Sequence, residues 1–462
     1  MIILEFLNER IVSTVAALML LAVGLFFSFR LGFFYLRHPI KSAKIMLEPE
    51  GQRGISPFRA VALALAGTLG VGNIAGVASS IAIGGYGSIF WMWVSALVAM
   101  VLKYAEIVLA MLHRRTDRES GECFGGAPYY IADLFSSRGR RISGKVTSAI
   151  FAVLCIVNSI TMGCVIQANA ASTSFSGVFG VSNALVGGAM ALLCIFVIVG
   201  NAHWVSGFCE KTVPLMTIGY ILISAAVIAA RWDGVGDAFR VIFEDAFKLD
   251  SAAGGVLGFL LSSKLRAGTM RGLMSNEAGC GTAPTAHASS ATKSPAKQGL
   301  WGIFEVFVDT VLLCTLTALV IILAGKEILA YSENPMMMAI KAYSSVLGGW
   351  SEIYMCVSVL FFAFATMVCW AHYGKESLRY LTRRKWASSL YVVAFCLFIL
   401  LGAISAPALA WLFADLSLGL MTIINLPVLC TMRGEVAEET KGLFTPLKTP
   451  RSQKTNKRTI PH

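Results

Sequence analysis

The stretch Ala66-Gly-Thr-Leu-Gly-Val-Gly-Asn73 lies inside a long apolar run that extends from about Ser56 to Ile83. Three glycines within six residues, followed by asparagine, are poor helix formers at what the run predicts to be mid-membrane depth. Lipid offers no partner for a freed backbone N–H or C=O group, so an irregular segment here must face protein or a water-filled cavity. We therefore expect a broken helix, whose two ends can hold an anion and a cation side by side.

Two other interpretations of these glycines stay open from this stretch alone. Gly72 and Gly76 form a small-xxx-small pattern, which is typical of close packing between membrane helices. A nucleotide-binding glycine loop is the weaker alternative, because no strand–loop–helix context surrounds the glycines.

The composition indicates a polytopic helical membrane protein. Of the 462 residues, 56% are hydrophobic and 14% are charged, whereas a soluble domain carries about a quarter charged residues. The net charge of +12 does not indicate nucleic-acid binding, because the basic residues cluster between apolar runs and in the C-terminal tail. The 11 cysteines stand singly, and HExxH and G-x-S-x-G motifs are missing, so we expect neither a metal cofactor nor an enzyme.

Apolar runs predict about eleven transmembrane helices. They cover about residues 11–34, 56–83, 88–112, 146–173, 181–199, 213–230, 252–292, 301–324, 352–373, 386–403 and 406–429. A short segment at about 128–135 is expected to lie at the membrane interface. Lys and Arg gather in alternate loops, which places the N-terminus outside and the C-terminus in the cytoplasm.

A second break strengthens the transporter interpretation over helix packing. The run that starts near residue 252 is interrupted by Ser275-Asn-Glu-Ala-Gly-Cys-Gly-Thr-Ala-Pro284. Without the first helix, the remaining ten form two oppositely oriented groups of five, and each group opens with a broken helix, as in inverted-repeat transporters. The expected segments are an extra helix with a cytoplasmic link (1–50), the first repeat (51–232), an external segment with the second repeat (233–432), and a disordered basic cytoplasmic tail (433–462).

Six motifs between Ile55 and Lys385 are long enough to compare with known families. They are Ile55-Ser-Pro-Phe58, Gly67-Thr-Leu-Gly-Val-Gly-Asn-Ile-Ala-Gly-Val-Ala78, Ile89-Phe-Trp-Met-Trp-Val-Ser-Ala96, Lys103-Tyr-Ala-Glu106, Gln167-Ala-Asn169 and Ser275-Asn-Glu-Ala-Gly-Cys-Gly-Thr-Ala-Pro-Thr-Ala-His287. Together they resemble the alanine/glycine:cation symporter family. The resemblance implies an all-α integral membrane protein with a LeuT-type 5+5 inverted repeat preceded by one extra helix. It also implies alternating-access import of small neutral amino acids such as alanine and glycine with sodium, across the plasma (inner) membrane.

The resemblance implies a sodium site by position. The C=O groups of Ala66 and Leu69 and the hydroxyl of Thr366 would coordinate the ion, and oxygen ligands suit a hard cation. The alternative for Thr366 is a hydrogen bond to its own helix. Ala365 stands where the family usually has a second hydroxyl residue.

The resemblance also implies where the substrate carboxylate and ammonium bind. The N–H groups of Val71, Gly72 and Asn73 would receive the carboxylate at a half-helix N-terminus. The C=O group of Thr68 would lie near the ammonium.

Three further residues are expected to complete the substrate pocket. Gln167 would hydrogen-bond a polar end of the substrate, or else join two helices. Trp370 and Met274 would form apolar walls, although large side chains there can also be ordinary core.

Several charged residues fall inside predicted membrane spans. Lys103 and Glu106 are three residues apart and are expected to neutralise each other on one helix face. Glu305 and Asp309 share a face that must look toward the interior or toward water, and Glu277 lies in the second break. These groups either fix the broken helices or relay protons, which keeps a proton-coupled transporter as an alternative. An ion channel and an intramembrane enzyme are the rivals from other classes, and oligomeric state stays open.

Overall fold

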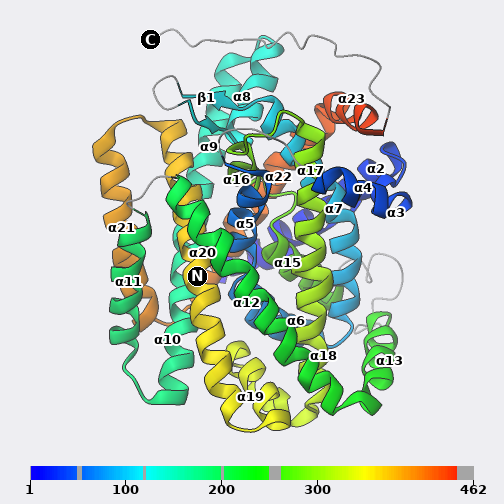
Figure 1. The fold of residues 1–462 in the computed structure, drawn as a ribbon, viewed down its shortest axis with the longest axis vertical. Helices are drawn as coiled ribbons and strands as arrows, with labels where there is room; N and C mark the ends of the chain where they lie inside the picture. The colour runs from blue at the N-terminus through cyan, green and yellow to red at the C-terminus, as the bar shows by residue number, and fades with distance from the viewer. Residues whose placement is uncertain (1, 49–54, 118–120, 199–201, 249–261, 445–462) are drawn as a thin grey trace.

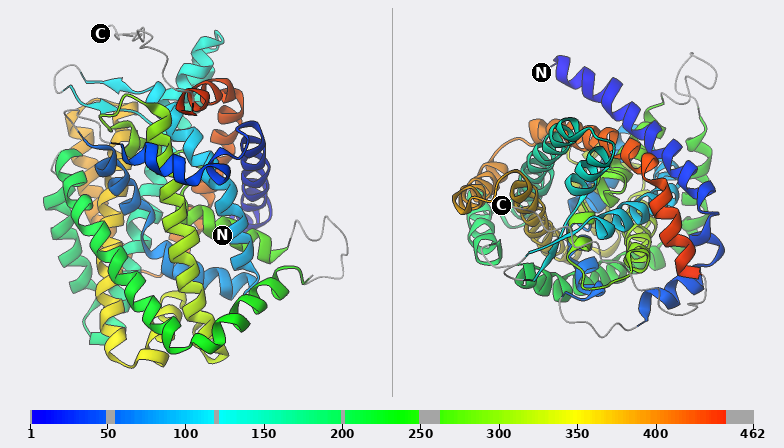
Figure 2. Two further views of the ribbon diagram at one scale, coloured as in Figure 1. Left: turned by 45° about the vertical axis from the view of Figure 1, so that its right-hand side comes forward. Right: turned by 90° about the horizontal axis from the view of Figure 1, so that it is seen from above.

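The computed structural model describes residues 2–48, 55–117, 121–198, 202–248 and 262–444. Its regular structure is almost entirely helical, and the described part adds one short antiparallel pair, β1 (Arg115–Thr116) with β2 (Cys123–Phe124). The long helices run roughly along the longest axis and pack into one bundle, seen from the side in Figure 1 and end-on in Figure 2. The expected all-α membrane fold is confirmed at this level.

Within the described ranges, eight helices are long and apolar enough to cross a membrane. They are α2 (Ser13–Arg30), α7 (Ser88–Leu112), α9 (Arg141–Ile160) continued by η3 (Thr161–Val165) and α10 (Ile166–Phe179), α12 (Ala202–Ala230), α17 (Pro295–Val306) continued by η5 (Phe307–Cys314) and α18 (Thr315–Leu323), α20 (Trp350–Leu381), α21 (Lys385–Ile404) and α22 (Ala408–Thr431). A ninth span is bent by 51°: α5 (Pro57–Thr68), then η2 (Gly72–Gly76) with α6 (Val77–Gly84). The apolar helix α11 (Asn183–Ile198) is shorter.

Shorter helices complete the described structure, some inside the bundle and others at its two ends. They are α1 (Ile2–Phe6), η1 (Leu7–Val12), α3 (Phe34–Arg37), α4 (Pro39–Leu47), α8 (Ala127–Ser137), η4 (Trp232–Gly234), α13 (Val235–Ala246), α15 (Ser263–Asn276), α16 (Pro284–Ala288), η6 (Lys326–Tyr331), α19 (Pro335–Leu347) and α23 (Arg433–Phe444). In Figure 1, α8 and α23 lie at the upper end and α13 and α19 at the lower end. The helix α8 confirms the short segment predicted near residues 128–135.

The first break occurs where the sequence predicts it. Ser56 begins α5 by accepting a hydrogen bond from the Arg59 N–H at 3.2 Å, and the helix ends at Thr68. Leu69 leaves the helical region with φ −75° and ψ 81°, and helical structure resumes only at Gly72. Residues 60–81 are all buried, so the freed backbone groups face protein instead of lipid, as the solvation argument requires.

The second break is also confirmed. α15 ends at Asn276, and the next residue, Glu277, has φ +55°, a left-handed conformation that non-glycine residues adopt rarely. Gly279 and Gly281 have φ of +90° and +81°, which only glycine adopts without strain, and Pro284 starts α16. The start of this run, predicted near residue 252, lies outside the described residues.

The expected disorder of the tail is wrong for its first twelve residues. Arg433–Phe444 form α23, which packs on the end of α7. Val436 is fully buried, and the Thr440 hydroxyl hydrogen-bonds the Tyr104 hydroxyl at 2.9 Å. A few anchoring contacts therefore order a segment whose charged composition alone predicts disorder. Residues 445–462 lie outside the described part of the chain.

His113 connects this helix to the bundle and makes its attachment sensitive to pH. The Nδ1 atom lies 2.9 Å from Asp133 and the Nε2 atom 2.9 Å from Glu435 of α23. Burial lowers the pKa of His113, but hydrogen bonds with both carboxylates outweigh it and raise the pKa to about 9. The unfolded value is about 6.5, so the stabilisation is complete below about pH 6.5 and is lost as the pH rises through 9.

We expect thermal stability in detergent to fall as the pH is raised from about 7 to about 10, by roughly 1–3 kcal/mol of unfolding free energy. His113→Gln should flatten that part of the profile. A wild-type profile without a drop in this window would contradict the assignment.

Candidate functional site

The two breaks meet at the centre of the bundle. A Cβ atom added to Gly72 would lie 3.6 Å from the Ser275 Cα and 3.7 Å from the Met274 carbonyl oxygen, so the two backbones are in contact. The Asn73 side chain also donates to the Ser275 hydroxyl at 3.1 Å. The residues that the sequence selects from two distant stretches therefore form one site.

Three oxygens converge at the end of α5. The Thr366 hydroxyl of α20 lies 3.0 Å from the Ala66 carbonyl oxygen and 3.4 Å from the Leu69 carbonyl oxygen. These are the three groups that the sequence predicts as sodium ligands. Thr366 donates across to α5 and not to its own helix. The neighbouring Ala365 is buried and contributes no hydroxyl.

The groups predicted to receive the substrate carboxylate are partly engaged in this conformation. The Val71 N–H donates to the Gln167 Oε1 at 3.2 Å, and the Asn73 N–H donates to the Gly70 carbonyl at 3.2 Å. The Thr68 carbonyl, predicted to lie near the ammonium, accepts from the Gly70 N–H at 2.9 Å. Gln167 of α10 thus touches the break at Val71, one of the residues predicted to receive the carboxylate.

The two predicted apolar walls lie in different surroundings. Met274 is buried at the end of α15, where its carbonyl faces Gly72. Trp370 of α20 is fully buried and packs edge-on against Tyr373, with ring centroids 5.4 Å apart. The space that a Cβ of Gly163 would fill is occupied by the Trp370 ring, so this glycine admits the indole against η3.

A cavity of about 610 Å³ reaches this centre from the end of the bundle that carries α19. Val71 and Ala75 line it on one side, and Asn169 and Thr173 of α10 line it on another. Met274 and Trp370 do not line it. The cavity therefore connects the first break with the outside of the bundle. The two predicted wall residues, Met274 and Trp370, lie away from this connection.

An ion pair that sequence reasoning missed borders the cavity. Arg271 of α15 contacts Asp415 of α22 through two hydrogen bonds of 3.0 and 3.2 Å, and its guanidinium lies 4.8 Å from the centre of the Trp411 ring. One feature of the sequence could have indicated the pair: each of the two helices carries a charged residue inside a buried span. Such charges usually need a partner. Nothing in the sequence pairs these two positions, which are 144 residues apart.

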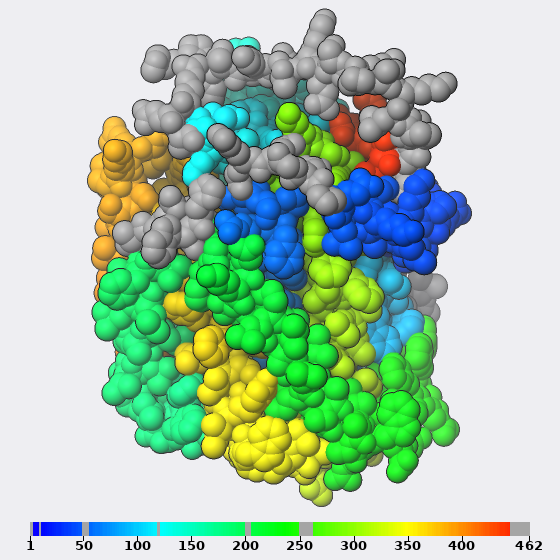
Figure 3. Space-filling model, viewed as in Figure 1, coloured from blue at the N-terminus to red at the C-terminus, as the bar shows by residue number. Residues whose placement is uncertain are grey.

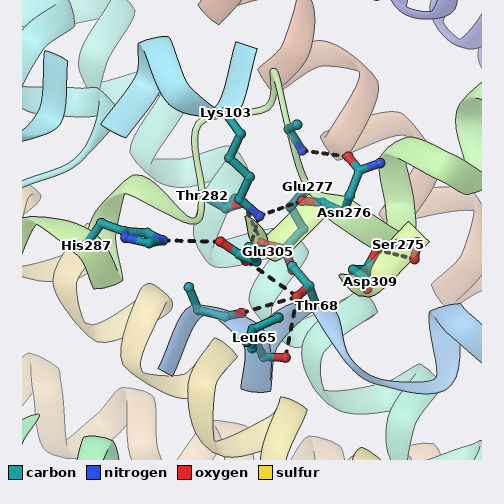
Figure 4. Close-up of polar contacts among 12 residues, drawn as sticks. Leu65, Thr68, Lys103, Ser275, Asn276, Glu277, Thr282, His287, Glu305 and Asp309 are labelled. Atoms are coloured by element: carbon teal, nitrogen blue, oxygen red, sulfur yellow. Dashed lines mark hydrogen bonds and ion pairs between the residues drawn. The ribbon is translucent and has the colours of Figure 1, made fainter. Parts of the chain in front are cut away.

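A second, fully buried network lies on the other side of the first break (Figure 4). The Lys103 ammonium of α7 lies 2.6 Å from Glu305 of α17 and donates to the Asn276 carbonyl, also at 2.6 Å. The other Glu305 oxygen lies 3.1 Å from the His287 Nε2, and the Thr68 hydroxyl donates to Glu305 at 3.4 Å. One ion pair thus contacts both broken helices.

This network corrects the expected pairing of Lys103 with Glu106. Glu106 instead accepts a hydrogen bond from Asn425 of α22 at 2.5 Å. The i,i+3 spacing placed both residues on one buried face of α7, but the partner of each is chosen by the helix packed against it. Glu305 and Asp309 do face the interior, as predicted, and both are fully buried.

Neutral donors surround the remaining buried carboxylates. Asp309 accepts hydrogen bonds from the Ser275 hydroxyl at 2.6 Å, the Asn73 amide at 2.7 Å and the Thr310 hydroxyl at 2.7 Å. Glu277 accepts from the Thr282 hydroxyl at 2.7 Å. Asp309 joins the two breaks to η5, and Glu277 holds the turn of the second break, so the geometry favours the structural interpretation of both groups.

Comparison with known proteins shows the family of the chain. The model of the sodium:alanine symporter family matches residues 1–457. The chain belongs to this family. It is 34% identical over 429 residues to the sodium/alanine symporter AgcS of Methanococcus maripaludis, covering 92% of this chain and 93% of that protein. It is also 34% identical to the amino-acid carrier protein AlsT of Bacillus subtilis, covering 89% and 86% of the two chains.

Solved transporter structures share the fold of this family member. The structure of MhsT in complex with L-phenylalanine has a TM-score of 0.56 at 11% identity, covering 85% of this chain and 93% of MhsT. A manganese transporter of Eremococcus coleocola has a TM-score of 0.52 at 12% identity, covering 87% and 84%. At these identities the likeness concerns the fold alone, which is the LeuT-type arrangement of helices.

Proposed function

We propose that this protein is a sodium-coupled symporter that imports small neutral amino acids by alternating access. The observation that carries the proposal is the convergence of the Thr366 hydroxyl on the Ala66 and Leu69 carbonyls. An all-oxygen site at the C-terminal end of a half-helix suits a hard cation, since the helix dipole is negative there. We further propose that ten of the helices form a 5+5 inverted repeat, that α2 is the extra helix, and that the protein is not an enzyme.

The substrate we propose is alanine, glycine or an amino acid of similar size. The names of relatives support an amino acid, since they include a sodium/alanine symporter and a probable sodium/glutamine symporter. We propose a small pocket at the break, where Gly72 has no Cβ to obstruct a ligand that approaches the backbone. In a competition assay against labelled alanine, we expect glycine, alanine and serine to inhibit and leucine and phenylalanine not to. Strong inhibition by leucine would rule out the small pocket.

The proposed orientation puts the N-terminus outside and the C-terminus in the cytoplasm of the plasma (inner) membrane. Basic residues gather at one end of the bundle. Arg114, Arg115, Arg140, Arg141, Arg383, Arg384 and Lys385 belong to the end with α8 and α23, and Asp233, Asp237, Glu244 and Glu333 to the end with α13 and α19. Basic loops stay in the cytoplasm, so the cavity beside Val71 would open outward. Reporter fusions at both termini test this orientation.

Thr366→Ala is expected to raise the sodium concentration needed for half-maximal alanine uptake about ten-fold, because one ligand oxygen is lost from the site. Proteoliposomes with imposed sodium or proton gradients measure this, and Thr366→Ser should restore the wild-type value. Thr161→Ala is a matched control, because the Thr161 hydroxyl donates within its own helix to Val157. An unchanged sodium dependence in Thr366→Ala would remove this residue from the site.

A proton-coupled transporter is the second candidate. The buried carboxylates Glu277 and Glu106 favour it, since one oxygen of each lacks a hydrogen-bond partner among the described residues. Uptake driven by a pH gradient in sodium-free buffer would select this candidate over sodium coupling.

A further inference from the structure

A groove on one flank of the bundle shares no lining residue with the cavity at the first break. It has a volume of about 670 Å³ and runs between α11 and α21, with Lys375 of α20 at one end. Both helices form the left flank of the bundle in Figure 1, and Figure 3 shows their atoms at the surface there. Small residues open the groove: a Cβ added to Gly188 would meet only Leu400, at 4.0 Å.

The apolar part of the groove matches one leaflet of a bilayer. Its α21 side extends from Ser388 to Leu400, which is about 18 Å of helix at 1.5 Å per residue. Half of the hydrocarbon core is about 15 Å thick, close to the length of one acyl chain. The walls between those ends are aliphatic, with Leu192 and Ile195 of α11 facing Val392 and Leu397 of α21.

The polar end of the groove carries a cation with donors to spare. The Lys375 ammonium donates one hydrogen bond, of 3.0 Å, to the Ile198 carbonyl at the end of α11. No carboxylate lies within 4.0 Å of it among the described residues, and its neighbour Glu376 lies 3.7 Å from Arg379. Two of the three ammonium donors are therefore available to a ligand.

Further positive charge directly precedes Ser388 in the chain. Arg383, Arg384 and Lys385 are exposed in the turn between α20 and α21, and Ser388 lies in the first turn of α21. Basic pockets between membrane helices on the cytoplasmic side bind anionic lipid headgroups. The apolar part of the groove thus fits an acyl chain, and its basic end fits the anionic headgroup of the same lipid.

We propose that this groove is a binding site for an anionic phospholipid of the cytoplasmic leaflet. One acyl chain lies between α11 and α21, and the headgroup phosphate accepts hydrogen bonds from Lys375 and Ser388. Because Lys375 and Thr366 are nine residues apart on α20, the lipid contacts the helix that carries the proposed sodium ligand. The lipid site does not depend on which solute the protein transports.

Native mass spectrometry of the purified protein in detergent tests the proposal, with phosphatidylglycerol and phosphatidylcholine of identical acyl chains added separately. We expect wild-type protein to retain phosphatidylglycerol about five-fold better than phosphatidylcholine. Lys375→Gln should remove this preference, and Gly188→Phe, which fills the groove, should lower retention of both lipids. Lys326→Gln at the opposite end and Gly207→Phe on α12, where a Cβ meets no atom within 4 Å, should retain both lipids as wild type does.

Equal retention of the two lipids by wild-type protein would overturn the proposal, as would a preference that survives Lys375→Gln. Thermal stability of each variant is measured alongside. If Gly188→Phe unfolds, Val392→Phe fills the same groove from α21 and is judged by the same criterion. The readout requires no transport, so a failure here is distinct from a failure of sodium coupling.

Discussion

Gly70→Ala is expected to abolish alanine uptake, with a loss of at least about 100-fold. The added Cβ would lie 2.5 Å from the Thr366 hydroxyl and 3.2 Å from the Gln167 Oε1, so it displaces a proposed sodium ligand and a proposed substrate ligand together. Both neighbours are fully packed, and overpacking of this kind costs about 1–3 kcal/mol of stability. Uptake of labelled alanine and thermal stability are measured on the same preparation.

Gly76→Ala is the matched control, because it lies in the same bent span and a Cβ there meets no atom within 4 Å. It should transport and unfold as wild type does. The double variant Gly70→Ala with Thr366→Ala removes the closest atom and should recover thermal stability without recovering sodium-driven uptake. Normal uptake by the single Gly70→Ala variant would show that transport does not require the close approach of Gly70 to Thr366.

Lys103→Met is expected to lower the unfolding free energy by about 3–5 kcal/mol, because it leaves a buried carboxylate without its cation. The side chains of Lys103 and Glu305 are both 0% exposed, and their charges are 2.6 Å apart. The variant also frees the Asn276 carbonyl at the end of α15, so transport should be lost even where protein is recovered. Thermal unfolding in detergent and alanine uptake give the two measurements.

The control for the buried pair is an ion pair of similar length near the surface. Lys341 and Glu352 are 2.7 Å apart, with 32% and 19% of their side chains exposed, and Lys341→Met should cost no more than about 1 kcal/mol. Adding Glu305→Gln to Lys103→Met removes the uncompensated charge and should restore most of the lost stability. Equal losses of unfolding free energy in Lys103→Met and Lys341→Met would contradict a larger contribution from the buried ion pair than from the exposed one.

The helices and the two breaks follow from local sequence. α7 is predicted at Ser88–Leu112 and is observed there, because an apolar run of that length, with charges only at Lys103 and Glu106, has no stable alternative in a bilayer. The glycines around Gly70 and the segment from Ser275 to Pro284 break their helices, because neither stretch favours continuous helical dihedrals. The segment α23 was missed, because its order depends on contacts with Tyr104 and His113 that are more than 300 residues away.

The sequence by itself therefore determined the membrane class, the approximate position of most long helices and the two interruptions, since these depend on hydrophobic length and backbone propensity. It missed the start of α12, which begins at Ala202 and not near residue 213. Only the tertiary structure decided which side chains meet. Lys103 pairs with Glu305, 202 residues away, and not with Glu106 on its own helix. Thr366 lies against the carbonyls of Ala66 and Leu69 because α20 packs on α5. A buried polar group must hydrogen-bond to a group on the helix that packs against it and shields it from water. Local sequence does not encode which helix that is.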